Sequence, residues 1–186
     1  MTELHQNQLD EPIEIQPYDP VWIEVFRSES ANLWARLRDQ VIAIEHIGST
    51  AIPGLRSKPV IDVMVGVEAI DLFPEVLAPL LDEYDSLGEA GVPGRLYFRK
   101  RKNEAINVHA VEYLGRHWVN NILVREYLLA HPHEAERYGR AKDRILAEGL
   151  RTLLAYSHAK QTIMAKLLTD ARAWGHRHSL ERGNSA

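Results

Sequence analysis

The chain has 186 residues, of which 45% are hydrophobic and 26% are charged, so it can bury a substantial core and is not disordered by composition. Its formal net charge of -4 at pH 7 gives no general attraction to nucleic-acid backbones, and nucleic acid is not an expected partner. The absence of cysteine excludes disulfides, thiolate zinc sites and cysteine nucleophiles. Because no signal segment opens the chain and no apolar run approaches the roughly 20 residues that span a bilayer, we expect a cytoplasmic protein without a membrane partner.

The first elements are a polar segment, a short strand and a helix. Residues 1–10 lack periodicity and are expected to form a flexible leader, whereas Ile13 and Ile15 alternate with polar residues as in a short edge strand. Asp19 and Pro20 resemble a helix N-cap followed by proline at the first helical position. The following apolar stripe predicts a helix of about five turns. The stripe comprises Trp22, Phe26, Leu33 and Leu37.

Strands and turns dominate the next part of the sequence. Apolar runs rich in β-branched residues predict strands over 41–47 and 59–67, joined by a loop that Pro53 and Gly54 shape. Residues 71–84 have a helical pattern. A turn at 92–94 then precedes a hairpin with strands at 96–98 and 106–111 and a polar tip at 101–104.

After residue 115 the pattern is entirely helical. Helices are predicted over residues 118–130, 133–149 and 153–174. The sequence therefore predicts an α+β protein, with a mixed β-sheet and packed helices in residues 11–115 and a helical lobe of the same unit in 116–175. Residues 176–186 are expected to be a flexible tail.

Two features point to phosphate and metal chemistry. Gly48, Ser49 and Thr50 follow a strand without a bulky side chain, so backbone N–H groups and two hydroxyls can approach a phosphate. Asp62 lies within an apolar strand, where a carboxylate needs an ion pair, a hydrogen bond or a cation. An ordinary turn at Gly48 and a structural salt bridge from Asp62 to Lys58 or an arginine are the alternatives.

These residues carry a family resemblance. The run from Glu45 to Val67 resembles the GrpB family, which is itself similar to nucleotidyltransferases, whose core is a Gly-Ser turn followed about a dozen residues later by a strand with carboxylates at alternate positions. Residues 50–61 separate Ser49 from Asp62, which fits this spacing. Further segments resemble GrpB positions and extend the resemblance over most of the chain. They are Tyr18–Pro20 with Trp22 and Phe26, Asn107–His109, Arg125–Leu128, Tyr156 and Lys160.

The resemblance implies a nucleotidyltransferase-like fold with Gly48 and Ser49 at a triphosphate and Asp62 as a ligand of magnesium or manganese. Active members carry a second acid two residues later, on the same side of the strand, where this chain has Met64. A thioether is a poor ligand for magnesium, so catalysis is in question more than binding is. Met64 and Asp62 are expected to face the same cleft.

A further metal ligand is expected from the neighbouring strand. His109 and Glu112 are three residues apart and point to opposite faces of that strand, and the family pattern favours His109. If His109 binds the metal, zinc becomes as plausible as magnesium. The alternative is a half-buried histidine bonded to backbone.

Basic residues are candidates for phosphate contacts. Lys58 is close to Asp62 in sequence, and Tyr156 and Lys160, four apart on a helix, share a face. The hairpin adds a basic cluster, although solvated tips are the commoner fate of such clusters. The cluster comprises Arg99, Lys100, Arg101 and Lys102.

The sequence therefore predicts a GrpB-family protein that binds a nucleotide or another phosphorylated small molecule, with metal-dependent nucleotidyl transfer through Asp62 and Ser49 as its candidate activity. The alternative is a non-catalytic nucleotide-binding or regulatory module. Some GrpB-like domains are fused to dephospho-coenzyme A kinase, which suggests a link to coenzyme A metabolism. The sequence does not define the oligomeric state.

Overall fold

The fold is built on one mixed sheet. The computed structural model describes residues 10–69 and 77–183, with side chains described as far as residue 177. The sheet has five strands in the order β1-β2-β5-β4-β3. They are β1 (Ala43–Ile47), β2 (Ile61–Val67), β3 (Asp85–Ser86), β4 (Arg95–Lys100) and β5 (Ile106–Glu112). β2 runs antiparallel to β1 and parallel to β5, while β4 is antiparallel to both β5 and β3. The α+β class, the mixed sheet and the β4–β5 hairpin are confirmed.

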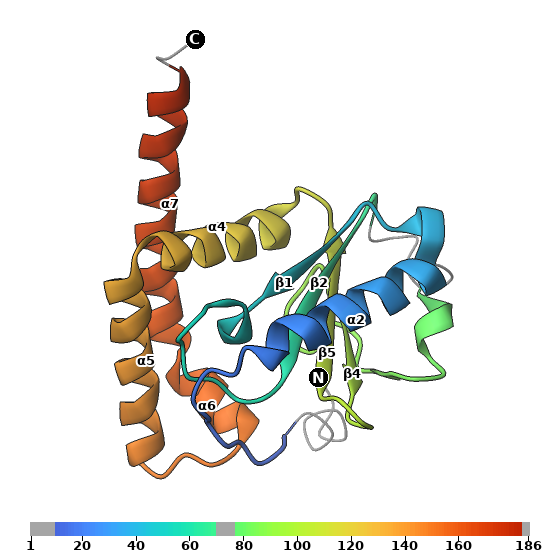
Figure 1. Cartoon of the computed structure of the whole chain (residues 1–186), viewed down its shortest axis with the longest axis horizontal. Coiled ribbons are helices and arrows are strands. Elements are labelled where there is room, and N and C mark those ends of the chain that lie inside the picture. Colours follow the sequence, from blue (N-terminus) through green and yellow to red (C-terminus); the bar gives the residue numbers. More distant parts are fainter. Residues whose placement is uncertain (1–9, 70–76, 184–186) are drawn as a thin grey trace.

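Helices lie on the sheet and beside it (Figure 1). The α-helices are α2 (Val21–Leu37), α4 (Arg116–Ala130), α5 (Pro132–Ala147), α6 (Leu153–Ala159) and α7 (Gln161–Gly183). Short 3-10 helices are η1 (Arg38–Gln40), η2 (Ser49–Ala51) and η4 (Ala78–Leu80). The backbone N–H of Val21 donates to Asp19 Oδ1 at 2.9 Å, so Asp19 supports the start of α2 as the sequence predicts. The helices α4 to α7 gather at one end of the sheet, in the part of the chain where only helices were predicted.

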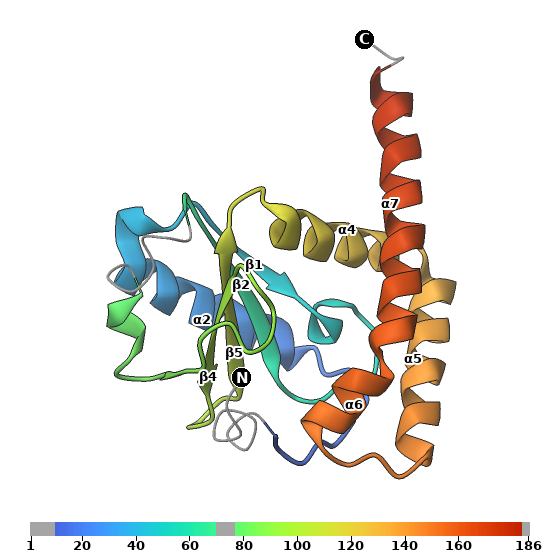
Figure 2. The ribbon, with the colours of Figure 1, turned by 180° about the vertical axis from the view of Figure 1, so that it is seen from behind.

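One face of the sheet packs on α2. Val63 and Val65 of β2 and Val108 of β5 are completely buried on this face, together with Leu33 of α2. α2 crosses in front of the sheet in Figure 1 and behind it in Figure 2. This side of the sheet is therefore the main apolar core.

The other face changes character along β2. Met64 is fully buried in an apolar cluster with Ile47, Val111 and Trp118. At Gly66 an added Cβ would lie 2.6 Å from the Trp118 ring, so glycine allows α4 to approach the sheet closely. Met64 shares a face with Asp62, but Trp118 and its neighbours seal it from solvent. The expectation that Met64 lines the same cleft as Asp62 was wrong.

Three predicted elements differ from the structure. The segment around Ile13 and Ile15 makes only isolated bridges, Pro12 with Thr152 and Gln16 with Ser57, because it pairs with loops instead of a sheet edge. Of the helix predicted over 71–84, residues 71–76 lie outside the described part of the chain. From residue 77 onward the structure has a 3-10 turn, with proline in its first positions, instead of an α-helix.

The last predicted helix is divided. α6 ends at Ala159 and α7 begins at Gln161, so the expected single helix over 153–174 is interrupted at Lys160. α7 then runs to Gly183, through most of the segment expected to be a tail, and extends past α4 in both views (Figures 1 and 2). Polar residues do not by themselves end a helix, and no proline interrupts this one.

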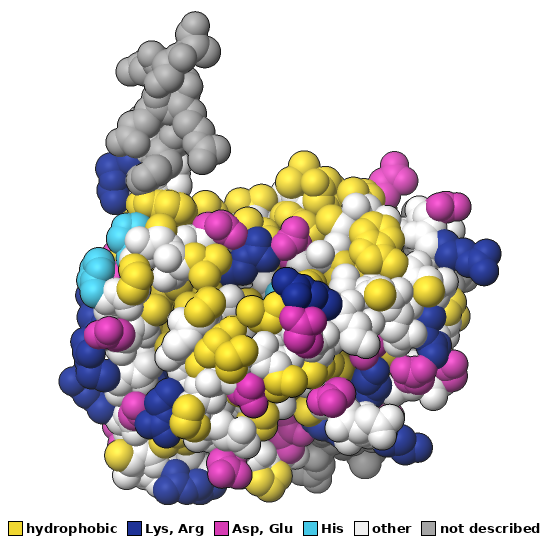
Figure 3. All heavy atoms as spheres, viewed as in Figure 1, with side chains coloured by type: hydrophobic (Ala, Val, Ile, Leu, Met, Phe, Trp, Pro, Cys, Tyr) yellow, Lys and Arg dark blue, Asp and Glu magenta, His cyan; other side chains and the backbone are white. Residues whose placement is uncertain are grey.

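The surface over α2 carries both signs of charge. Figure 3 shows Lys and Arg side chains interspersed with Asp and Glu side chains on this face. Within the described residues, no helix combines the length and the apolar character that crossing a membrane requires.

Candidate phosphate-binding site

The Gly48–Ser49 turn lies directly against Asp62. Ile47, the last residue of β1, pairs with Asp62 of β2, so the next residue, Gly48, reaches the Asp62 side chain. A Cβ at Gly48 would lie 2.6 Å from Asp62 Oδ2, and Gly48 has a φ of 74°. Glycine is required here both for the left-handed backbone and for the close approach. The strand register thus brings the two predicted motifs together.

Asp62 is held by two donors from β5. Asn107 Nδ2 donates to Asp62 Oδ1 at 2.6 Å, and His109 Nε2 lies 3.2 Å from the same oxygen. Burial alone would raise the pKa of Asp62, but Lys58 and the hydrogen bonds from His109 and Asn107 outweigh burial and hold this pKa below its ordinary value. Asp62 is therefore ionised at neutral pH.

His109 has both ring nitrogens engaged. Its Nδ1 lies 3.3 Å from Arg95 Nη1, and because arginine can only donate, Nδ1 is the acceptor and Nε2 carries the proton donated to Asp62. Burial lowers the pKa of His109 despite the opposing effect of Asp62, so the ring is neutral. In this geometry His109 orients the carboxylate and has no lone pair free for a metal.

The ligating groups do not form a two-carboxylate metal centre. Among the residues that the structure describes, no group of three or more His, Cys, Asp or Glu side chains could surround one ion. Asp62 Oδ1 accepts from Asn107 and His109, whereas Oδ2 faces the Gly48 turn. The donor set fits at most a single cation at Asp62 Oδ2 that takes its other oxygen ligands from phosphate and water.

Two predicted lysines come close to Asp62. Burial lowers the pKa of Lys58, and Asp62 opposes that shift. The pKa of Lys160 is likewise lowered by burial and raised by Asp62, and Lys160 Nζ lies 4.5 Å from the centroid of the Tyr156 ring. Tyr156 is itself buried and positions the lysine. Two cations therefore share one carboxylate, although they lie far apart in sequence.

A third lysine was missed in the sequence. Lys142 of α5 is only 1% exposed, its Nζ lies 3.2 Å from Ser49 Oγ, and it also donates to the carbonyl of Arg56. Burial, with Lys160 next in effect, lowers the pKa of Lys142 to about 7. Tyr138 lies beneath it, with the ring centroid 4.9 Å from Nζ. The available signal was spacing, because Lys142 falls on the buried stripe of α5 four residues after Tyr138.

Thr50 does not join the site. It is 1% exposed, and its Oγ1 lies 3.0 Å from His46 Nε2. The His46 ring stacks on Phe26 of α2 with centroids 4.7 Å apart, which places this pair on the α2 side of the sheet. Gly48 and Ser49 therefore face the site, while Thr50 anchors the turn from behind.

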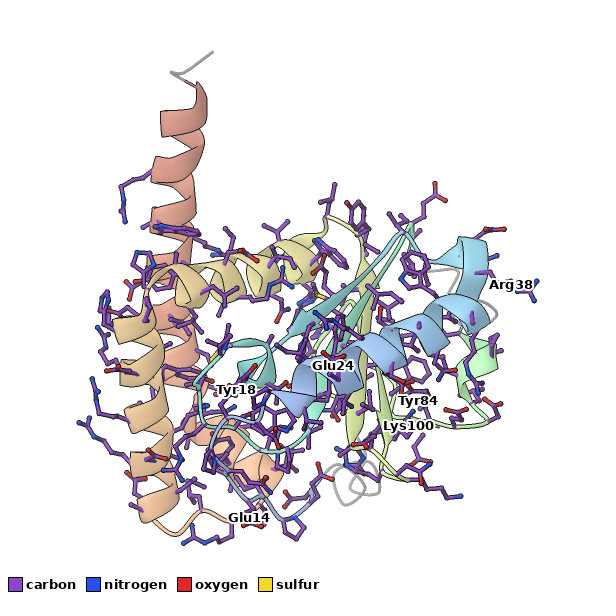
Figure 4. All side chains as sticks on the ribbon, viewed as in Figure 1. Glu14, Tyr18, Glu24, Arg38, Tyr84 and Lys100 are labelled. Atoms are coloured by element: carbon purple, nitrogen blue, oxygen red, sulfur yellow. The ribbon has the colours of Figure 1, made fainter. Side chains whose placement is uncertain are left out.

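The basic side chains of the β4–β5 hairpin are divided between the two faces of the sheet. Lys100 forms an ion pair with Glu29 of α2 and lies over the Tyr84 ring at 5.1 Å, where Figure 4 shows Lys100 and Tyr84 close together. Arg101 instead donates to Asn107 Oδ1 at 3.0 Å and so supports the residue that holds Asp62. Lys102 is exposed.

Glu11 partly neutralises this edge of the site. It pairs with Arg101 at 2.7 Å and with Arg99 at 3.6 Å. Burial alone would raise the pKa of Glu11, but the hydrogen bond and charge of Arg101, with Arg99 and Lys58, lower it. The two arginines therefore have Glu11 as a carboxylate partner, whereas Lys58 and Lys160 share Asp62.

A cavity of about 470 Å³ opens at the turn. Gly48, Ser49 and Ile52 line it, together with Val92 and side chains of α4, α5 and α7. A separate cavity of about 500 Å³ lies between residues 52–56 and α5, and neither Gly48 nor Ser49 lines it. The cavity of about 470 Å³ is therefore the one that adjoins the Gly48–Ser49 turn.

Comparison with known families gives one match over most of the chain. Residues 12–170 match the family described as GrpB protein. The chain belongs to the GrpB family. The UPF0157 protein YqkA of Bacillus subtilis (strain 168) is 32% identical over 166 residues, which cover 87% of this chain and 48% of YqkA. This chain thus spans about half the length of that relative.

Two further comparisons place this GrpB-family chain. The crystal structure of the conserved protein GrpB from Enterococcus faecalis superposes with a TM-score of 0.78 at 29% identity and covers 87% of this chain and 99% of that one. Dephospho-CoA kinase of Mycobacterium tuberculosis (strain H37Rv) is 36% identical over 73 residues, or 38% of this chain and 18% of the kinase. The GrpB fold is therefore shared over nearly the whole chain, and the kinase likeness is confined to one segment.

Proposed function

We propose that this GrpB-family protein binds a nucleotide or another phosphorylated small molecule beside the Gly48–Ser49 turn. The observation that carries the proposal is the imbalance of charge beside the turn, where Lys58 and Lys160 share the carboxylate of Asp62 and Lys142 Nζ lies 3.2 Å from Ser49 Oγ. Desolvated cations that lower each other's pKa are stabilised by an anion. A phosphate at the turn would supply that charge.

The local field opposes the charge of the whole chain. The protein carries -4 overall, so its surface does not concentrate anions in general. Binding of a phosphorylated molecule therefore depends on this cluster and on the N–H groups of the turn, which accommodate an anion at close range. A small ligand fits this arrangement better than a nucleic-acid backbone, which needs an extended basic surface.

Metal-dependent nucleotidyl transfer is the second candidate, and it rests on the contact between Asp62 Oδ2 and the turn. Magnesium or manganese would be held by Asp62 and by phosphate oxygens, and it would neutralise the charge of the phosphates. Ser49 and the turn amides would orient the triphosphate for attack by an acceptor hydroxyl. The single carboxylate equally suits a non-catalytic binding module.

A thermal-shift screen tests the binding proposal. The ligands are four nucleoside triphosphates, tripolyphosphate, coenzyme A and 4′-phosphopantetheine, each with and without magnesium, manganese or zinc, since a ligand of the native state raises stability by mass action. The coenzyme A compounds are included because one segment resembles dephospho-CoA kinase. No shift with any of these compounds would overturn the proposal.

Charge variants locate the site. Lys58→Met and Lys160→Met should each weaken binding by about tenfold, because each removes a charge-assisted contact. Lys102→Met, at an exposed position, should leave binding unchanged. Asp62→Asn should abolish the metal-dependent part of the stabilisation while keeping the shape of the side chain; unchanged metal dependence would show that Asp62 has a structural role alone.

A further inference from the structure

The cavity beside the turn continues directly from the phosphate-binding residues. Gly48 and Ser49 line it, and Ser49 Oγ lies 3.2 Å from Lys142 Nζ. A ligand with its phosphates at the turn would therefore place its remaining part in this cavity. Its volume of about 470 Å³ is within the range of pockets that enclose small organic molecules.

Most of the cavity wall is apolar. The apolar side chains come from the turn, from α4, from α7 and from Val92, and such a lining favours a flat, weakly hydrated group over a hydroxyl-rich sugar. Those of the turn and the two helices are Ile52, Val124, Leu128, Met164, Ala165 and Leu168. The phosphate and the apolar part of the ligand thus find separate surroundings within one continuous site.

Two neighbouring amides at the wall offer complementary polar groups. Asn120 Oδ1 accepts from Arg172 Nη2 at 2.9 Å, and Asn121 Nδ2 donates to the carbonyl of His117 at 2.8 Å. Among residues 10–69 and 77–177, no side chain or backbone group pairs with Asn120 Nδ2 or with Asn121 Oδ1. Both residues line the cavity, so one amide donor and one carbonyl acceptor remain there.

We propose that this cavity binds a nucleobase, so that the ligand of the protein is a nucleotide. A nucleobase has flat apolar faces and an edge that carries both hydrogen-bond donors and acceptors, which the apolar walls and the Asn120 and Asn121 amides complement. The proposal rests on the phosphate site proposed above. It assigns base recognition to α4 and α7, and phosphate binding to the sheet, the turn and the lysines.

Filling the cavity tests the proposal. Ala165 is exposed on α7 and lines the cavity, so Ala165→Phe should occupy the cavity without disturbing the core. Ala173→Phe is the matched control, at an exposed position of the same helix that does not line the cavity. Calorimetric titration with tripolyphosphate, the four nucleoside triphosphates and 4′-phosphopantetheine compares the parent and both variants.

In the parent, at least one nucleoside triphosphate should bind about tenfold or more tightly than tripolyphosphate, and Ala165→Phe should remove this advantage without weakening tripolyphosphate binding. Ala173→Phe should behave as the parent does. If nucleotides and tripolyphosphate bind equally tightly, or if only 4′-phosphopantetheine binds more tightly than tripolyphosphate, the proposal that the cavity binds a nucleobase is wrong. The proposed phosphate site would not be affected by either result. Absence of binding by every probe would overturn the phosphate site as well.

A second variant tests the amide donor. Asn120→Asp keeps the acceptor for Arg172 and replaces the amide N–H groups by an acceptor oxygen. The order of preference among the four nucleoside triphosphates should change in this variant, while its affinity for tripolyphosphate falls by less than threefold. An unchanged order would show that Asn120 does not contact a base and would overturn this assignment.

Discussion

The two faces of the sheet perform different tasks with the same strands. On the α2 side, Val63, Val65 and Val108 form a dry apolar core. On the opposite side, Asp62 and His109 belong to a polar site at one end, whereas Met64 is sealed under Trp118. Alternation along a strand assigns a residue to a face, but what packs on that face decides whether the residue meets solvent or core.

The same division applies to the buried polar groups. His46 and Thr50 form a closed hydrogen bond behind the turn, on the α2 side. Lys142 is equally buried, but its Nζ lies 3.2 Å from the hydroxyl of Ser49, a residue that lines the cavity. Variants and pH changes on the two sides should therefore affect different properties, with stability alone on the α2 side and both stability and binding at the site.

The largest effect should come from an acid at the sealed position. Met64→Asp places a carboxylate among Ile47, Val111 and Trp118, and we expect a loss of about 4 kcal/mol in the free energy of unfolding. Urea denaturation measures it. Met64→Leu, which preserves volume and polarity, should cost less than about 1.5 kcal/mol. A stable Met64→Asp protein with tighter magnesium binding would show that position 64 opens to the site after all.

The dependence of the free energy of unfolding on pH below neutrality should reflect the protonation of His46. Burial, against the opposing effect of Asp62, lowers its pKa from 6.5 to about 4, so between these values the unfolded chain binds a proton that the folded chain excludes. Stability is therefore lost as the pH falls from 6.5 to 4, by about 3 kcal/mol. Denaturation at several pH values should show a smaller loss for His46→Gln. The carboxylates that titrate in this range are common to both proteins, so identical curves would contradict the buried, neutral ring.

The dependence of the free energy of unfolding on pH above neutrality should reflect the protonation of Lys142. Its pKa is about 7 in the folded protein and 10.5 in the unfolded chain, so from pH 7 to pH 9 only the unfolded chain keeps the proton. Stability should rise by about 2 kcal/mol over this range and be lost again as the pH falls towards 7. Lys142→Met should flatten this rise, and Lys102→Met should retain it.

The smallest effects are expected from the two hydroxyl side chains of the turn, Ser49 and Thr50, which should differ in their effect on ligand binding. Ser49→Ala should weaken ligand binding by about fivefold, because Ser49 faces the cavity, and the loss of its hydrogen bond to the buried Lys142 should cost about 1 kcal/mol of stability. Thr50→Val removes a buried hydrogen bond to His46 and should cost about 1 kcal/mol of stability without altering affinity. Titration and denaturation measure these effects, and weaker binding by Thr50→Val but not by Ser49→Ala would mean that the turn presents its other side to the ligand.

Local patterns were sufficient for several elements and for part of the site. The apolar stripe of α2 and the alternation in β5 predicted those elements because burial on one face imposes a period. Asp62 was recognisable because a carboxylate in an apolar strand demands a partner, and Gly48 because a turn without a bulky side chain after a strand lets backbone N–H groups approach a phosphate. Lys142 was missed although its spacing from Tyr138 places it on the buried stripe of α5, because a lysine on a helix is usually exposed.

The sequence by itself determined the mixed α+β architecture and the two motifs that meet at Asp62, since these follow from periodicity and from residue types at short spacing, and its resemblance to the GrpB family identified the family. Tertiary structure alone decided that α4 seals Met64, that Thr50 turns to the α2 side and that His109 uses both ring nitrogens. It also brought Lys58 and Lys160 to the carboxylate of Asp62, and Lys142 to the hydroxyl of Ser49. The reason is that burial, pairing and charge are set by which elements pack together, and a pattern local to one segment does not contain its packing partners.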